Sequence, residues 1–181
     1  MLLSVRDAAD VLAFAGLTVE QTRLLLRTGV AGPGTPLGGA VGYEEDAVLG
    51  LATRPELEAR EVARVVPGGL YVARLGRAAT VDVTGPWAEA AGSLRDQPSM
   101  TEMSRALLAA RIAGHGRLPW VATMFGFVLL GAEAVGAWSD REHSRTLFAL
   151  EPPGAWFGQV EGHRLRTRRG RPGLLLTEGA R

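Results

Sequence analysis

Apolar residues near the start of the chain recur at the spacing of an amphipathic helix. The residues at positions i, i+3, i+4 and i+7 are Val5, Ala8, Ala9 and Leu12. This spacing gathers them on one face of a helix, which predicts that this face is buried. Ser4 stands just before the stripe, where its hydroxyl can accept a backbone N–H, so we expect the helix to begin there.

A second helix is expected to begin at Thr18. Thr18 and Gln21 have the spacing of a capping box, in which each side chain accepts the other residue's backbone N–H. The buried face is expected to contain Val19, Thr22, Leu25 and Leu26. Gly29 is a natural C-terminal stop. A glycine- and proline-rich stretch at 30–42 predicts a hairpin, and the acidic run 44–46 predicts the start of a third helix.

Beyond residue 56 the pattern changes to short alternating runs that are typical of strands. We expect strands at 70–75, 79–84, 120–125, 127–130, 134–138, 146–150 and 174–176. We expect helices at 86–95 and 99–113, and the second should bury Met100, Met103, Leu107 and Ala110. The segregated elements predict an α+β protein, with an N-terminal domain at 1–56 and a mixed α+β domain with a mainly antiparallel sheet at 57–181.

The stretch 120–138 is apolar enough to be considered as a membrane span. It carries a single charge, Glu133, but glycines and alternating β-branched and aromatic residues interrupt it. Two buried strands explain this pattern better than a transmembrane helix. We therefore expect no membrane association and a cytoplasmic protein.

Composition limits the chemistry that the chain can perform. There is no cysteine, and all 20 basic residues are arginine, so thiol and lysine chemistry are excluded. The histidines, His115, His143 and His163, show no metal-binding spacing. Four tryptophans and nearby phenylalanines in the second half are expected to form core, with a ligand pocket as the alternative. We expect no enzymatic activity, no cofactor and no metal.

The order of elements in the first part resembles a known family. The runs Ser4–Leu12, Gly16–Thr18, Arg23–Gly29 and Gly42–Val48 resemble the excisionase/MerR-like winged helix-turn-helix, over about the first 55 residues. The resemblance implies that the helix opened by Thr18 reads a DNA major groove. It also implies a homodimer on paired half-sites. The expected function is therefore a DNA-binding protein that acts as a transcriptional regulator in a bacterium.

Candidate DNA contacts come from both ends of the chain. In the N-terminal part they are Arg6, Thr18, Glu20, Gln21, Arg23 and Arg27. Near the C-terminus a basic arm adds Arg164, Arg166, Arg168, Arg169 and Arg171. Gln and Arg side chains pair with adenine and guanine edges, and arginine also grips phosphate with two parallel hydrogen bonds.

The net charge of the N-terminal part is also compatible with a second function. Residues 1–54 contain four arginines and six acids, a net charge of −2, and the expected wing at 32–39 has no basic residue. Because phosphate neutralisation supplies most nonspecific DNA affinity, such a module should bind DNA weakly. The alternative is an adaptor whose helix-turn-helix docks onto a protein partner without DNA.

Overall fold

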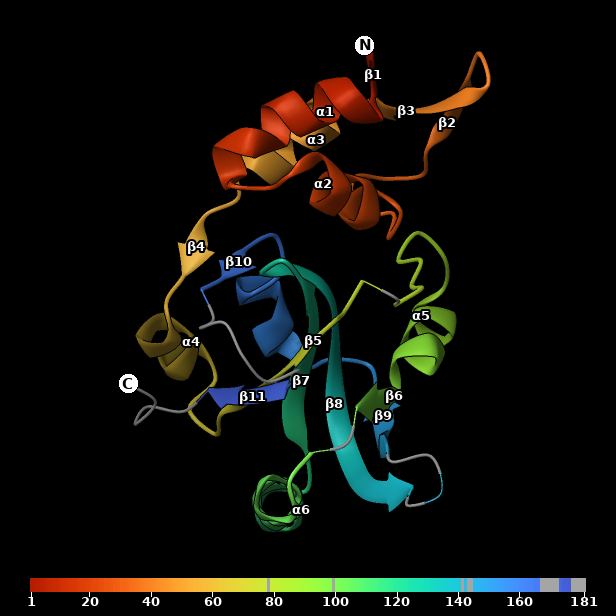
Figure 1. The fold of residues 1–181 in the computed structure, drawn as a ribbon. Helices are drawn as coiled ribbons and strands as arrows, with labels where there is room; N and C mark the ends of the chain where they lie inside the picture. Colours follow the sequence, from red (N-terminus) through yellow and green to blue (C-terminus); the bar gives the residue numbers. More distant parts are fainter. Residues whose placement is uncertain (78, 99, 141, 143–144, 167–172, 177–181) are drawn as a thin grey trace.

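A computed structural model describes residues 1–77, 79–98, 100–140, 142, 145–166 and 173–176 (Figure 1). The helices are α1 (Val5–Leu12), α2 (Val19–Leu26), α3 (Glu45–Ala52), α4 (Ala59–Val65), α5 (Trp87–Leu94) and α6 (Glu102–His115), with 3₁₀ turns η1 (Ala13–Ala15) and η2 (Ala155–Gln159). The strands are β1 (Leu2–Ser4), β2 (Thr35–Leu37), β3 (Ala40–Glu44), β4 (Glu56–Leu57), β5 (Leu70–Arg74), β6 (Asp96–Pro98), β7 (Leu118–Met124), β8 (Phe127–Asp140), β9 (Arg145–Glu151), β10 (Arg164–Leu165) and β11 (Gly173–Leu176). The predicted α+β class is confirmed.

Residues 1–53 form an N-terminal module in which both expected capping boxes are present. Ser4 Oγ accepts the Asp7 N–H at 3.3 Å, and the Asp7 carboxylate accepts the Ser4 N–H at 3.2 Å. In the Thr18–Gln21 box, Thr18 Oγ1 accepts the Gln21 N–H at 3.3 Å, and Gln21 Oε1 accepts the Thr18 N–H at 2.9 Å. The hydrogen bond from the Ser4 side chain and, to a smaller extent, that from the Ser4 backbone N–H lower the pKa of the Asp7 carboxyl group. These local bonds fix where α1 and α2 begin.

A small antiparallel sheet completes the N-terminal module. Its strand order is β1-β3-β2, and β2 and β3 form a hairpin between α2 and α3. The buried residues that the three helices contribute are Ala8, Ala9, Leu12, Thr22, Leu25, Leu26, Val48 and Leu51. The first predicted helix therefore buries the expected face, except that Val5 is only partly buried.

The second part of the chain is built on a mixed sheet with the order β11-β5-β7-β8-β10-β4, and β9 joins β8 to β6. Most pairs are antiparallel, while β5–β7 and β10–β4 are parallel. Helix α4 and η2 lie on one face, and α5 and α6 lie on the other (Figure 1). The mainly antiparallel sheet that the sequence predicts is confirmed.

Alternation along β5 and β7 divides the buried residues between two cores. Leu70, Val72 and Val121 belong to the core on the α4 face. Tyr71 and Trp120 belong to the other core, which packs against α5 and α6. Because side chains alternate across a strand, these near-continuous apolar runs fill both faces of the sheet.

The N-terminal module sits against the end of the sheet where the turn between β7 and β8 lies (Figure 1). The core on the α5–α6 face continues without interruption into the buried residues of the module. A hydrogen bond also joins the two parts, since Val83 N donates to Thr28 O at 2.8 Å, and Arg54, which directly follows the module, donates from Nη1 to Val128 O at 3.2 Å. The expected domain boundary at residues 56 and 57 falls within β4, which pairs with β10.

Several expected elements differ in the structure. The described residues of 79–84 form no strand, and the expected strands 127–130 and 134–138 are one continuous strand, β8. Helix α6 is capped by Thr101 and buries Leu108 rather than Met103, which is 72% exposed. Trp120 is buried as expected, but Trp138 is 50% exposed. Among the described residues, no helix is long and apolar enough to cross a membrane.

Candidate functional site

Helix α2 presents three different sides to its surroundings. The side that faces the module's interior carries Thr22, Leu25 and Leu26. The exposed edge carries Thr18, Val19, Glu20, Arg23 and Arg27. The third side lines two recesses shared with the second part of the chain, through Gln21, Leu24 and Thr28. Only part of the polar face of α2 is therefore open to a large partner.

The exposed edge of α2 carries both signs of charge. Arg23 and Glu20 form an ion pair one turn apart, with Nη1 and Oε2 separated by 3.2 Å and both side chains about half exposed. Arg27 lies one turn further on and lines a recess of about 510 Å³ together with Arg77 and Asp82. Hydrogen bonds from the Thr84 side chain and backbone lower the pKa of Asp82. Arg77 thus adds a cation from outside the N-terminal module.

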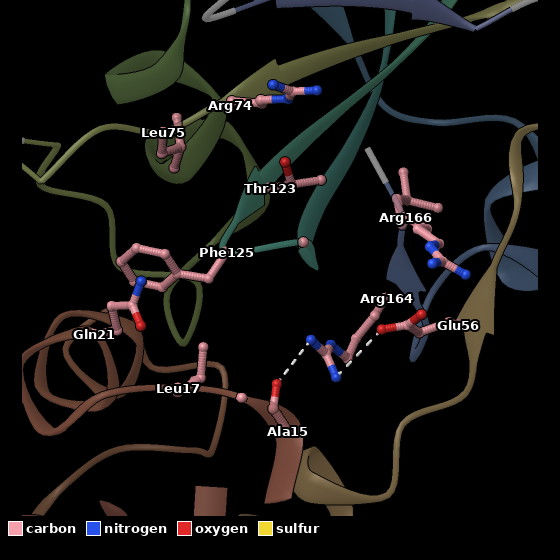
Figure 2. A pocket seen from close by; sticks show the side chains of 13 residues that line it. Ala15, Leu17, Gln21, Glu56, Arg74, Leu75, Thr123, Phe125, Arg164 and Arg166 are labelled. Carbon is pink, nitrogen blue, oxygen red and sulfur yellow. Dashed lines mark hydrogen bonds and ion pairs between the residues drawn. The ribbon is translucent and has the colours of Figure 1, made fainter. Parts of the chain in front are cut away.

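A larger concentration of arginines lines a cleft at the other end of α2, which we call the arginine cleft (Figure 2). Its volume is about 410 Å³. The module contributes Ala15, Gly16, Leu17 and Gln21, and the remaining lining residues are Glu56, Arg74, Leu75, Thr123, Phe125, Gly126, Arg164, Leu165 and Arg166. Residues from both ends of the chain therefore meet in one cleft.

Arg164 connects the two walls of the arginine cleft. One terminal nitrogen, Nη2, donates to Ala15 O at 2.9 Å, and Nη1 lies 3.5 Å from Glu56 Oε1 (Figure 2). The guanidinium carbon also lies 4.8 Å from the centre of the Phe127 ring, a cation–π contact. Its side chain is only 18% exposed. These contacts leave Arg164 little surface for a DNA phosphate.

The other two arginines have different surroundings. Arg166, which lines the arginine cleft, is 72% exposed and lies 4.0 Å from Glu58. Arg74, at the end of β5, is partly buried, and desolvation lowers the pKa of its guanidinium. A guanidinium still remains protonated at neutral pH. Among the residues that the structure describes, the lining of the cleft therefore holds three cations and one carboxylate.

The turn between β7 and β8 places an aromatic ring at the arginine cleft. Phe125 and Gly126 have φ values of +53° and +89°. Such a two-residue turn favours Asn-Gly, because non-glycine residues with a side chain this large rarely adopt the left-handed region. The Phe125 ring points toward Gln21 of α2 (Figure 2). Backbone strain is thus concentrated at the residue that brings an aromatic ring to the cleft.

The structure brings some of the predicted DNA contacts together and separates others. Gln21, Arg164 and Arg166 line the arginine cleft, while Glu20, Arg23 and Arg27 lie on the open edge of α2. Arg6 is exposed on α1. The remaining predicted residues of the arm, Arg168, Arg169 and Arg171, lie outside the described residues.

Sequence reasoning missed Arg74 and Arg77 as site residues, and it placed Phe125 in an aromatic cluster expected to form core, with a ligand pocket as the alternative. A usable signal existed for Phe125, because Phe-Gly separates two apolar runs at the position where hairpins favour Asn-Gly. No local signal marks Arg74, which ends an ordinary buried strand. For the described residues, no group of histidine, aspartate and glutamate side chains is arranged to hold a metal ion.

Comparison with known proteins gives no relative. No family model matches the chain, and neither the curated proteins nor the solved structures contain a match.

Proposed function

We propose that the protein binds duplex DNA through a winged helix-turn-helix at residues 1–56 and acts as a transcriptional regulator. The observation that carries this proposal is the arrangement of two capped helices, a hairpin and a third helix, with arginines on the open edge of the second helix. In helix-turn-helix proteins the second helix lies in the major groove. Here α2 would take that role, and β2–β3 would be the wing.

The open edge of α2 limits how the protein can approach DNA. Arg23 and Arg27 are accessible, and Arg77 lines a recess next to Arg27. The side of α2 that carries Gln21 and Leu24 faces the second part of the chain. Helix α2 would therefore enter a DNA groove obliquely, and the edge that carries Arg23 and Arg27 would make the contact. Such a contact uses few phosphates, so the affinity depends strongly on each arginine.

We expect that the double substitution Arg23→Gln and Arg27→Gln weakens DNA binding and flattens its salt dependence. Each phosphate contact contributes about 0.9 to the slope of log K against log salt, so removing two arginines should lower the slope by about 2. The measurement is fluorescence anisotropy with a random duplex of about two helical turns over a range of NaCl concentrations. Both residues are exposed, so the variant should fold normally.

Arg145→Gln is the matched control, because Arg145 is an exposed arginine that pairs with Asp96 far from α2. It should leave the slope unchanged. If the wild-type protein shows no binding even at low salt, or if the double variant keeps the wild-type slope, the proposal is wrong.

The adaptor function is the second candidate, and the hairpin favours it. Strands β2 and β3 contain no arginine, and their exposed side chains include Leu37 and Val41, which are 44% and 43% exposed. DNA-binding wings meet phosphates, whereas an exposed apolar pair is suited to another protein surface. Absence of DNA binding at low salt would favour docking through this hairpin.

For either function we propose that the protein is a homodimer, and sedimentation would test this oligomeric state.

A further inference from the structure

We propose that the arginine cleft binds a small organic anion whose carboxylate or phosphate contacts Arg166 and Arg74 and whose planar apolar part lies against Phe125. This site does not depend on DNA binding. Its chemistry is set by residues from the ends of β5, β7 and β10 and from the start of α2.

The charge balance of the arginine cleft favours an anion. Glu56 is the single carboxylate among the described lining residues, and Arg164 already lies 3.5 Å from it. Two further guanidinium groups line the same cavity: that of Arg166 lies 4.0 Å from Glu58, and that of Arg74 is partly buried, so the three arginines outnumber the carboxylates of Glu56 and Glu58. A guanidinium presents parallel N–H donors that match the oxygens of a carboxylate or phosphate. Polar neighbours, Thr123 and Gln21, add hydrogen-bonding groups.

The strained turn supports an aromatic contact. A phenylalanine at a φ of +53° is strained, and strain of this kind gathers at ligand sites. Asparagine would satisfy the same turn with Gly126. The ring of Phe125 therefore provides something other than turn stability: one part packs against the core, and the ring also lines the arginine cleft, where it offers an apolar surface to a ligand.

The size and position of the cleft fit a metabolite rather than a macromolecule. A volume of about 410 Å³ lies within the range of small-molecule sites, roughly 300–1,000 Å³. The parallel strands β5 and β7 both end at the cleft. Both walls are contributed by packed elements, so a ligand would contact the N-terminal module and the sheet at once.

The test uses the full chain and the probe phenyl phosphate, which combines an anion with a planar ring. Isothermal titration calorimetry should detect binding, and at a hundredfold excess over Kd the melting temperature should rise by about 5 °C or more. Arg166→Gln should weaken binding at least about tenfold, since one charge-assisted hydrogen bond is lost. Arg145→Gln should bind like the wild type.

Phe125→Asn tests the contact with the planar part of the ligand separately from the contact with its anionic group. This variant fits the turn, so it should fold, and it should weaken phenyl phosphate while leaving the weaker binding of inorganic phosphate unchanged. No calorimetric binding of phenyl phosphate at millimolar concentration would overturn the proposal. Equal binding by wild type and Arg166→Gln, equal affinity for uncharged benzyl alcohol, or displacement of phenyl phosphate by duplex DNA would each overturn it too. Because the Arg23 and Arg27 substitutions lie outside the cleft, failure of the DNA proposal leaves this result unaffected.

Discussion

Replacing Glu133 by alanine is expected to lower the free energy of unfolding by about 3 kcal/mol. Glu133 is buried in β8, and its Oε1 accepts hydrogen bonds from Trp156 Nε1 at 2.7 Å and from Gly154 N at 3.1 Å. Alanine would leave both donors without their acceptor and would open a cavity. Both donors belong to partly buried residues, so each lost hydrogen bond is unfavourable by about 1 kcal/mol, and the cavity accounts for the rest. Urea unfolding followed by tryptophan fluorescence measures the loss.

The control for this prediction is Glu133→Gln. Glutamine keeps an oxygen at the position of Oε1, so both donors retain an acceptor, and the loss should be only about 1 kcal/mol. If the alanine and glutamine variants are equally stable, the carboxylate does not anchor the segment around Trp156 as we infer.

Gly131→Ala is expected to lower the free energy of unfolding by about 2 kcal/mol or more, because a methyl group has no room there. A Cβ atom at Gly131 would overlap the Phe157 ring. That ring is held edge-on against Trp156, with centroids 5.7 Å apart, and packs against the core on the α4 face. To relieve this overlap, the Phe157 ring and the 3₁₀ turn η2 that carries it would have to move. Thermal and urea unfolding both report the change.

Gly136→Ala is the matched control in the same strand. A Cβ at Gly136 would meet Ala149 Cβ at 3.5 Å, which is ordinary van der Waals contact. We expect a change within about 0.5 kcal/mol. A similar loss for the two variants would show that strand propensity, rather than the contact with Phe157, sets the effect.

The features that the sequence predicts well are those fixed by near neighbours along the chain. The starts of α1 and α2 follow from Ser4 with Asp7 and from Thr18 with Gln21, whose hydrogen bonds span three residues. Such bonds form whatever the rest of the chain does. The short apolar runs of β5 and β7 similarly predict buried strands without knowledge of their partners.

The wrong predictions concern segments whose structure depends on distant partners. Val81 and Val83 alternate like a strand, but Val83 N donates to Thr28 O in the N-terminal module, and the segment packs against Gly29 through Thr84. Helix α6 has apolar residues on more than one side, and contact with β7 and β8 decides which of them is buried. For that reason the helical spacing alone does not predict that Leu108 is buried.

The arginine cleft could not be predicted from local patterns. Arg164 and Ala15 are hydrogen-bonded although 149 positions separate them. The sequence predicts Arg164 as part of an extended basic arm, because five arginines follow one another closely between 164 and 171. Only the packing of the N-terminal module on the sheet shows that the first of these arginines joins the two parts.

The uninterrupted apolar core between the N-terminal module and the sheet has a consequence for how the protein unfolds. Leu17 and Leu25 belong to the same buried cluster as Tyr71 and Trp120. Separating the halves would expose that shared surface to water, so heating should melt both together in one calorimetric transition. A fragment cut after residue 56 should be much less ordered than the same residues in the whole chain. Two well-separated heat-capacity peaks would show instead that the halves are independent.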